Sequence, residues 1–350
     1  MTRKVFVGPI AIGGGAPVTV QTMTNTDTRD VEATLSQIRT MAAAGADIVR
    51  VSVYDEACAR AVRDLVDGSP VPLVADIHFD HRLAIQSVEN GIAKVRINPG
   101  NIGGEAHVRE LSDCLKAHHI PVRIGVNSGS IEKDILAKYG GVTPEGMVES
   151  GLNHARMLEK VGFNDIVLSF KATDVQKMVA ACRLAAKVCD YPQHIGVTES
   201  GTADVGIVKS AVGIGALLLD GIGDTIRVSL SGDPVQEVPA GLSILRACGL
   251  RRDGVEIISC PTCGRTCIDV EGIARRVRAE TADIRVPIRV AVMGCVVNGP
   301  GEAREADLGV AGGRDGGALF VKDGAPRAIR GDLAAALIGE IRRIAAQRAE

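Results

Sequence analysis

The chain has 350 residues, of which 46% are hydrophobic and 23% charged, so it is long enough for one large globular domain and a smaller second one. Its 40 Lys and Arg nearly balance 42 Asp and Glu, the net charge is −2, and only 2% of the residues are aromatic. This composition argues against a general polyanion binder, which carries a basic excess, and against a single-stranded nucleic-acid binder that stacks bases on aromatic side chains.

Short β-branched runs alternate with longer segments of helical periodicity as far as Leu230. Eight runs are expected to be strands: Val18–Met23, Asp47–Val53, Val71–Ile77, Ala93–Asn98, Pro121–Val126, Asp165–Phe170, His194–Glu199 and Thr225–Leu230. Helices are expected between most of them: Val31–Ala44, Glu56–Val66, Arg82–Glu89, Val108–His118, Glu145–Val161, Asp174–Val188 and Ala203–Leu219. Eight such units predict a (β/α)8 TIM barrel, whereas a doubly wound open sheet usually has fewer.

The pattern changes after Leu230, where Ser231-Gly-Asp-Pro and Pro239 interrupt the chain. A new series follows: strand Val255–Ser259, helix Val270–Ala279, strand Ile288–Val292, a glycine-rich hairpin over Gly309–Val321 and helix Leu333–Arg348. We therefore expect a barrel over residues 1–238, a linker over 239–254 and a smaller α+β domain over 255–350.

No apolar run approaches the ~20 residues of a membrane-spanning helix. The apolar stretch near the N-terminus is interrupted by Pro9 and by Gly13–Gly15, which is not the pattern of a signal peptide. We expect a soluble, cytoplasmic protein.

Five of the expected strands carry a cationic side chain towards their carboxyl ends, where TIM barrels place their active sites. These side chains are Arg50, Arg96, Arg123, Lys171 and Arg227. Because an unpaired buried charge is very costly, this set indicates a multiply charged anionic ligand, most simply phosphate or diphosphate. The alternative is that some of the five point outward to the helices and pair there.

Other polar side chains occupy the same strand ends. Asn98, Asn127 and Ser229 could bind the ligand. Asp76 and Glu199 are candidates for proton transfer or hydroxyl binding, and the alternative for both is an ion pair with the arginines. His78 could bind substrate or a metal, although Asp-x-His alone is a weak metal signal.

Four of the nine cysteines fall within 260–295, and the closest pair forms Cys260-Pro-Thr-Cys263 directly after an expected strand. With Cys295, which follows another strand, these residues fit three roles. A redox disulfide would not need Cys295. A structural zinc site would need a fourth ligand, which could be Cys267. An iron–sulfur cluster can take three cysteines and leave one iron for a different ligand.

The segment after Cys295 contains the tight turn Asn298-Gly-Pro-Gly, followed by Glu302. Such a turn can return the Glu302 carboxylate towards the metal that Cys295 binds, where a hard oxygen ligand would be exchangeable beside three soft thiolates. The alternative is a solvated loop carboxylate.

Taken together, these motifs resemble one family, the bacterial 4-hydroxy-3-methylbut-2-enyl diphosphate synthases of the methylerythritol phosphate route to isoprenoids. The resemblance covers the whole chain. It includes Val20-Gln-Thr-Met-Thr-Asn-Thr-Asp-Thr, Ala75-Asp-Ile-His-Phe-Asp, Val95-Arg-Ile-Asn-Pro-Gly-Asn-Ile-Gly, Arg123-Ile-Gly-Val-Asn-Ser-Gly-Ser, Ser169-Phe-Lys, Val197-Thr-Glu-Ser-Gly, Thr225-Ile-Arg-Val-Ser-Leu, Cys260-Pro-Thr-Cys-Gly-Arg and Met293-Gly-Cys-Val-Val-Asn-Gly-Pro-Gly-Glu.

The resemblance implies a (β/α)8 barrel with a C-terminal [4Fe-4S] domain whose ligands fall on Cys260, Cys263, Cys295 and Glu302. It implies reduction of 2-C-methyl-D-erythritol 2,4-cyclodiphosphate by two electrons, with ring opening and loss of water, to (E)-4-hydroxy-3-methylbut-2-enyl diphosphate. Flavodoxin or ferredoxin would donate the electrons. The family forms a head-to-tail homodimer in which the cluster domain of one subunit caps the barrel of the other.

Within this resemblance, the cationic strand ends hold the diphosphate, Glu199 protonates a leaving hydroxyl, and Asn298 bridges cap and substrate. Cys267 lies outside the implied ligand set and is expected to be a bystander; the alternatives are an oxidation-sensitive thiol and a competing ligand. Two other functions remain open on the residues alone. One is a pterin-type transferase with a structural zinc tail, and the other is a non-catalytic iron–sulfur sensor or carrier.

Overall fold

The computed structural model describes residues 1–98, 101, 104–295, 305–313 and 316–349. The chain divides into two compact units, Met1–Arg251 and Arg252–Glu350. Each has its own hydrophobic core.

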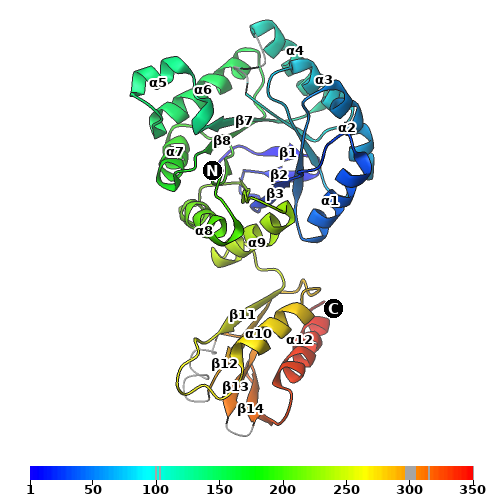
Figure 1. The fold of residues 1–350 in the computed structure, drawn as a ribbon, viewed down its shortest axis with the longest axis vertical. Helices are drawn as coiled ribbons and strands as arrows, with labels where there is room; N and C mark the ends of the chain where they lie inside the picture. Colours follow the sequence, from blue (N-terminus) through cyan, green and yellow to red (C-terminus); the bar gives the residue numbers. More distant parts are fainter. Residues whose placement is uncertain (99–100, 102–103, 296–304, 314–315, 350) are drawn as a thin grey trace. The chain divides into compact units, whose positions relative to one another are not determined.

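The first unit is a parallel β-barrel surrounded by helices (Figure 1). Its strands are β3 (Thr19–Met23), β4 (Ile48–Ser52), β5 (Leu73–Asp76), β6 (Lys94–Ile97), β7 (Val122–Asn127), β8 (Ile166–Lys171), β9 (His194–Ile195) and β10 (Thr225–Ile226). They pair in the order β8-β7-β6-β5-β4-β3-β10-β9. The barrel closes where Leu168 of β8 donates its N–H to the carbonyl of Pro192, at 2.9 Å. The expected TIM-barrel fold is confirmed.

The helices that connect the strands cover the outside of the barrel (Figure 1). They are α1 (Val31–Ala43), α2 (Glu56–Gly68), α3 (His81–Glu89), α4 (Glu105–His118), α5 (Lys133–Tyr139), α6 (Pro144–Lys160), α7 (Val175–Val188), α8 (Ala203–Leu219) and α9 (Glu237–Ala247). Several begin at an aspartate that accepts a backbone N–H of the first turn, as Asp30 does from Ala33 and Asp55 from Cys58. These caps set where the helices start, and so how long the loops at the barrel mouth are.

An antiparallel hairpin, β1 (Val5–Val7) with β2 (Ile10–Ile12), covers the amino end of the barrel. Its residues Val5, Val7 and Ile12 pack against Ile48, Val74 and Val167, which open three of the strands. Side chains alternate along a strand, so these three residues point inward, and so do the residues two and four positions later. The apolar plug therefore lies under a barrel interior that becomes polar towards the carboxyl ends.

The second unit is a five-stranded sheet in the order β11-β12-β13-β14-β15. Its strands are β11 (Val255–Ser259), β12 (Ile288–Met293), β13 (Leu308–Gly313), β14 (Gly316–Val321) and β15 (Arg327–Ile329), and its helices are α10 (Val270–Glu280) and α12 (Leu333–Ala349). Both helices pack against one face of the sheet, where Val277 and Ile341 join Val290, Val292 and Val310 in one core. The expected α+β module is thus present, with β11, β12 and β13 parallel and the rest antiparallel.

The structure differs from the sequence expectations in detail. β9 and β10 have only two residues each and end at Ile195 and Ile226, well before the expected ends at Glu199 and Leu230. At those two positions the chain is not a strand: Glu199 adopts a left-handed backbone (φ 51°), and Leu230 turns its N–H to the carboxylate of Glu237. The first part of the segment expected as a linker forms α9, which packs on β3 and α8 of the first unit. The hairpin β1–β2, the short helix α5 and the edge strand β15 were not anticipated. Among the helices described, none is long and apolar enough to cross a membrane.

Candidate active site

The carboxyl ends of the barrel strands surround a polar pocket of about 200 Å³. All five cationic side chains singled out in the sequence line it. The described lining residues are Arg50, Asp76, His78, Arg96, Arg123, Gly125, Asn127, Ser169, Lys171, Thr198, Arg227 and Ser229. Asp76 is the one carboxylate among them, so the pocket carries a large excess of positive charge.

Asp76, at the end of β5, balances part of this charge. Its Oδ1 accepts a hydrogen bond from Nη1 of Arg96 at 3.0 Å, and its Oδ2 lies 3.7 Å from Nη1 of Arg50. His78 approaches the same carboxylate at 3.6 Å and lies 3.1 Å from Arg96. Burial alone would raise the pKa of Asp76, but the charges of Arg50 and Arg96 and the contact with His78 outweigh it and hold that pKa far below its ordinary value.

The remaining cations are less well compensated. Arg123 and Lys171 are almost fully buried and form no ion pair with any carboxylate of the described residues. Burial, and then the neighbouring positive charges, lower the pKa values of both side chains well below their ordinary values, and the same causes lower the pKa of Arg50 to about 10. Three buried polar atoms at this end of the barrel, Arg96 Nε, Arg123 Nε and Ser169 Oγ, have no hydrogen-bond partner among the residues that the structure describes. An anion that accepts several hydrogen bonds would satisfy both the charges and these donors.

Two glycines leave room for the cations. A Cβ on Gly125 of β7 would lie 2.7 Å from Nε of Arg96, and a Cβ on Gly196 would lie 3.1 Å from Nζ of Lys171. Real Cβ atoms do not approach other heavy atoms as closely as the first of these distances. The guanidinium of Arg96 therefore crosses the mouth of β7 only because residue 125 lacks a side chain.

Arg227, which directly follows β10, is paired with a buried carboxylate that does not line the pocket. Glu237, the first residue of α9, is 1% exposed and forms a two-point ion pair with Arg227. The Arg227 side chain therefore has its direction set by the helix that follows the barrel.

Two of the sequence candidates lie close to the pocket without lining it. Asn98, which follows β6, is buried. Glu199 lies on the loop after β9, exposed, and its Oε2 accepts a hydrogen bond from Oγ1 of Thr173 at 2.9 Å. The carboxylate of Glu199 is thus at the rim of the barrel mouth and not within the cationic cluster.

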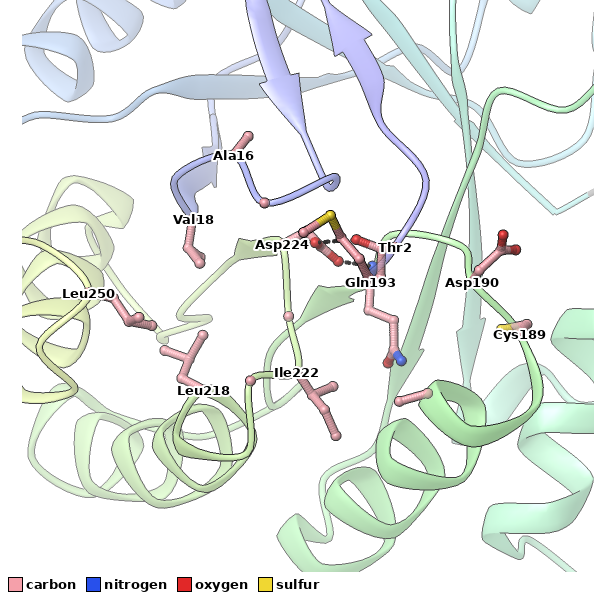
Figure 2. A pocket seen from close by; sticks show the side chains of 15 residues that line it. Thr2, Ala16, Val18, Cys189, Asp190, Gln193, Leu218, Ile222, Asp224 and Leu250 are labelled. Atoms are coloured by element: carbon pink, nitrogen blue, oxygen red, sulfur yellow. Dashed lines mark hydrogen bonds between the residues drawn. The ribbon is translucent and has the colours of Figure 1, made fainter.

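A second cavity, of about 470 Å³, lies where the N-terminal segment meets the loops before β9 and β10 (Figure 2). Figure 2 shows Asp224 there, accepting hydrogen bonds from Oγ1 of Thr2 and from the backbone N–H of Gln193, both at 2.8 Å. Its described lining residues include Asp190 and Asp224 but no Lys or Arg. This cavity is larger than the pocket at the strand ends, but its charge does not suit an anion.

In the second unit, Cys260 and Cys295 come after neighbouring parallel strands, β11 and β12. The backbone N–H of Gly294 donates to Sγ of Cys260 at 3.1 Å, and the carbonyl of Gly294 accepts the N–H of Cys267 at 2.8 Å. Cys263 is exposed on the turn after β11. Cys267, also exposed, directs its Sγ to the carbonyl of Arg265 at 3.3 Å. Adjoining strand ends therefore hold Cys260 and Cys295, while the thiol of Cys267 is turned to its own loop.

The donor set suits an iron–sulfur group, because three soft thiols are available and a backbone N–H already points at one sulfur. Within the described part of the chain, no three His, Cys, Asp or Glu side chains are grouped so that they could hold a single metal ion. The remaining two candidates, Asn298 and Glu302, lie outside the described residues.

Comparison with known proteins identifies the family. The family model described as the GcpE TIM-barrel domain matches residues 2–242, and the model of the GcpE protein C-terminal domain matches residues 256–343. The chain belongs to the GcpE family. A relative from Caldanaerobacter subterraneus is 56% identical over 92% of this chain and 91% of its own length, and one from Geobacter sulfurreducens is 53% identical over 99% of both. Each is named 4-hydroxy-3-methylbut-2-en-1-yl diphosphate synthase (flavodoxin).

Solved structures with a similar barrel include the N-acetylneuraminic acid synthetase of Leptospira borgpetersenii and the dihydropteroate synthase of Yersinia pestis. Their TM-scores are 0.51 and 0.50, with 13% and 12% identity, over 71% of this chain and 91% and 100% of theirs. At this identity the likeness shows the fold alone. A pterin-type transferase, one of the alternatives from the sequence, is therefore not favoured for this member of the GcpE family.

The sequence analysis missed three buried polar residues of this GcpE barrel. Lys94 precedes Arg96 by two positions on β6, so the period-two alternation that placed Arg96 inside also places Lys94 there. His194, on β9, has the same relation to Gly196, which directly follows that strand. Glu237 carried a weaker signal, as an acidic residue that opens an otherwise apolar helix after the last strand.

Proposed function

We propose that the chain catalyses the two-electron reductive ring opening of 2-C-methyl-D-erythritol 2,4-cyclodiphosphate, with loss of water, to (E)-4-hydroxy-3-methylbut-2-enyl diphosphate. It is an enzyme of isoprenoid precursor formation, the activity for which its relatives in the GcpE family are named. The observation that carries the assignment of the site is the pocket at the strand ends, where five cations face one carboxylate.

The cationic side chains bind the diphosphate. Arg96 and Arg123 each have a buried Nε–H without an acceptor, and a phosphate oxygen would accept both. Lys171 adds a point charge without the planar geometry of a guanidinium. Arg50 adds a further guanidinium beside Asp76, and Arg227 is held in place by Glu237. The polar side chains of His78, Asn98, Asn127 and Ser229 complete the substrate site at its rim.

The two carboxylates of the barrel mouth have different roles. Asp76 stays ionised at neutral pH because its pKa is held far below the ordinary value, so it orients Arg50 and Arg96 and does not donate a proton. Glu199 lies at the rim, where its Oε2 accepts from Thr173 and its Oε1 has no side-chain hydrogen bond to any described residue. We assign to Glu199 the protonation of the leaving hydroxyl.

The cofactor is a [4Fe-4S] cluster held by Cys260, Cys263, Cys295 and Glu302. When bound, such a cluster supplies electrons one at a time, and an iron with an exchangeable ligand can polarise a C–O bond. The N–H of Gly294 that points at Sγ of Cys260 would stabilise a thiolate there. Asn298, which lies close to Glu302 in the sequence, would contact the substrate.

The electron donor is flavodoxin or a ferredoxin; flavodoxin appears in the names of the relatives. The active form is a head-to-tail homodimer in which the cluster unit of one subunit covers the barrel of the other. We assign the substrate to the first unit, Met1–Arg251, and the cluster to the second, Arg252–Glu350. The expected linker over 239–254 is thereby shortened, because α9 belongs to the barrel unit. We place the enzyme in the cytoplasm.

The test begins with metal and sulfide analysis of the full chain purified anaerobically. About four irons and four sulfides per chain are expected, whereas one zinc without sulfide would contradict the proposal. The protein is then given the cyclic diphosphate and reduced flavodoxin, and product is measured by chromatography. Tight binding of the substrate without any product would contradict the catalytic assignment.

A further inference from the structure

The interior of the barrel has a second polar layer directly beneath the diphosphate pocket. It contains Lys94 of β6, His194 of β9 and Gln21 of β3, which are 0%, 0% and 1% exposed. Lys94 lies two residues before Arg96, which lines the pocket, so its side chain points into the barrel, where it meets Gln21. His194 lies two residues before Gly196, the glycine beside Nζ of Lys171. The diphosphate-binding residues do not include any of these three.

Lys94 has no counterion in the structure. Its Nζ donates to Oε1 of the neutral Gln21 at 3.2 Å, and it forms no ion pair with a carboxylate of the residues described. The titratable and charged groups that the other strands place in the pocket and in the layer beneath it are Arg50 (β4), Asp76 (β5), Arg123 (β7), Lys171 (β8), His194 (β9) and Arg227 (directly after β10), of which Arg123, Arg50 and His194 act on Lys94. Five of these are bases, and Asp76 is already engaged with Arg50 and Arg96.

His194 is equally isolated. Both ring nitrogens are buried, and neither has a hydrogen-bond partner in the described part of the chain. Burial, followed by the charges of Arg123, Lys171 and Lys94, lowers the pKa of His194 well below its ordinary value. Burial, followed by Arg123 and Arg50, does the same to the pKa of Lys94. Without a ligand, both groups are therefore driven towards their neutral forms.

A diphosphate in the pocket reverses this balance. It neutralises Arg50, Arg123 and Lys171, whose charges act against protonation of Lys94 and His194, and it adds negative charge above them. An opposite charge favours the protonated form of a base, so the pKa of each buried base rises when the anion enters.

We propose that substrate binding is coupled to proton uptake in this layer: Lys94 accepts a proton from solvent when the diphosphate enters, and His194 is a second acceptor. The reaction is addition of one proton to the neutral amine of Lys94, giving its ammonium ion, and no other bond changes. Lys94 is thus a positioning residue that adds charge to the site only when the site is occupied. This inference rests on the proposed function, because it requires that the pocket above Lys94 binds a diphosphate.

The experiment is calorimetric titration of the full, anaerobically purified chain with inorganic diphosphate, in two buffers of different ionisation enthalpy at one pH. The difference in apparent enthalpy gives the protons exchanged per diphosphate. We compare wild type with Lys94→Met, which has a neutral side chain of similar length, and with Lys177→Met, which removes an exposed lysine of α7. Protons lost by the diphosphate itself cancel when the proteins are compared.

We expect net proton uptake to be smaller in Lys94→Met than in wild type, with Lys177→Met equal to wild type and His194→Gln between the two. The wild-type affinity for diphosphate should fall more steeply with rising pH than that of Lys94→Met, by up to about tenfold per pH unit for one proton. Equal uptake in wild type and Lys94→Met would overturn the inference and leave the diphosphate site intact. Failure of the wild type to bind diphosphate would contradict the proposed function instead.

A second measurement, thermal unfolding as a function of pH, tests both whether Lys94→Met folds and whether Lys94 is neutral in the unliganded protein. An unfolded lysine binds a proton more readily than Lys94 does in the unliganded barrel, so wild-type stability should rise with pH between the folded pKa of Lys94 and its unfolded value. Lys94→Met should fold with native circular dichroism and lack this rise. A Lys94→Met barrel with the same pH dependence of thermal unfolding as wild type would show that Lys94 is charged throughout, which also overturns the inference.

Discussion

Arg227 and Glu237 form a two-point ion pair, with Nε 3.1 Å from Oε2 and Nη2 3.2 Å from Oε1. The same carboxylate accepts the hydroxyl of Thr22 at 2.8 Å and the N–H of Leu230 at 3.1 Å. The Glu237 side chain of α9 thus connects three parts of the barrel: Thr22 of β3, Arg227 directly after β10, and Leu230 in the loop between β10 and α9. The direction of a pocket cation is set by a residue that the ligand does not need to touch.

Replacing Glu237 with Gln should therefore affect both stability and turnover. The variant leaves Arg227, whose side chain is 15% exposed, with a neutral partner, and breaking a buried ion pair on one side costs about 3–5 kcal/mol. We expect the barrel's transition in denaturant unfolding to move down accordingly and kcat/KM to fall. Asp190→Asn is the matched control, because its pair with Arg3 is half exposed and should contribute at most about 1 kcal/mol. Equal losses in the two variants would contradict the role given to Glu237.

Gly125→Ala tests the space that the pocket reserves for Arg96. The new Cβ would lie 2.7 Å from Nε and 2.9 Å from Nη2 of Arg96, so the guanidinium has to leave its place beside Asp76. Losing one guanidinium–phosphate contact should weaken diphosphate binding by about tenfold or more, since a hydrogen bond to a charged group contributes about 1.5–3 kcal/mol. Calorimetric titration with inorganic diphosphate measures this change.

Gly129→Ala is the control for that variant, because a Cβ on Gly129 meets no atom within 4 Å. It should bind diphosphate like the wild type. If both alanine variants bind equally well, the close approach of Arg96 to β7 is not required for the site.

Asp76→Asn separates binding from turnover. The pocket gains one net positive charge, so inorganic diphosphate should bind at least as tightly. The value of kcat should fall because an amide has only one acceptor oxygen and no charge, whereas Arg96 and Arg50 lie at different oxygens of the carboxylate. Since the pKa of Asp76 is lowered, its stabilising contribution is present above the unfolded value of about 4 and is lost as the pH falls towards the folded value. Thermal unfolding of Asp76→Asn should therefore depend less on pH in acid than that of wild type. Weaker diphosphate binding by the variant would be inconsistent with this account.

The sequence predicted the barrel and the inward cations because period-two alternation on short buried strands leaves few arrangements for Arg50, Arg96 and Arg123. It did not predict Glu237 as a partner of Arg227, because nothing local marks which buried base a helical carboxylate will meet. The left-handed backbone of Glu199 was equally invisible, since Glu is not a residue that signals positive φ. The hairpin over residues 5–12 was missed because three-residue strands are too short for a periodicity to appear.

The cysteines of the second unit give a prediction about cofactor content. Cys267→Ser should keep about four irons per chain, because the thiol of Cys267 is directed to the carbonyl of its own loop. Cys263→Ser should lose most of the iron and sulfide under the same anaerobic purification. Iron loss in Cys267→Ser as large as in Cys263→Ser would replace Glu302 by Cys267 in the proposed ligand set.

Substitutions of Glu199 test whether the general acid of the reaction lies at the rim of the barrel. Glu199→Gln should lower kcat by about 10²–10⁴-fold, the usual contribution of a general acid, while the affinity for inorganic diphosphate stays unchanged.

The backbone of Glu199 has a left-handed φ of 51°, so the experiment needs a control that separates an effect of the backbone from an effect of the carboxylate. Glu199→Gly separates these causes, since glycine adopts that φ without strain and has no acid. Equal loss of kcat in the Gln and Gly variants would assign the effect to the carboxylate, and a Gln variant with wild-type kcat would remove Glu199 from the proton transfer. Thr173→Val, which removes only the hydrogen bond to Oε2, should lower kcat less than either, because it leaves the acid in place but less well oriented.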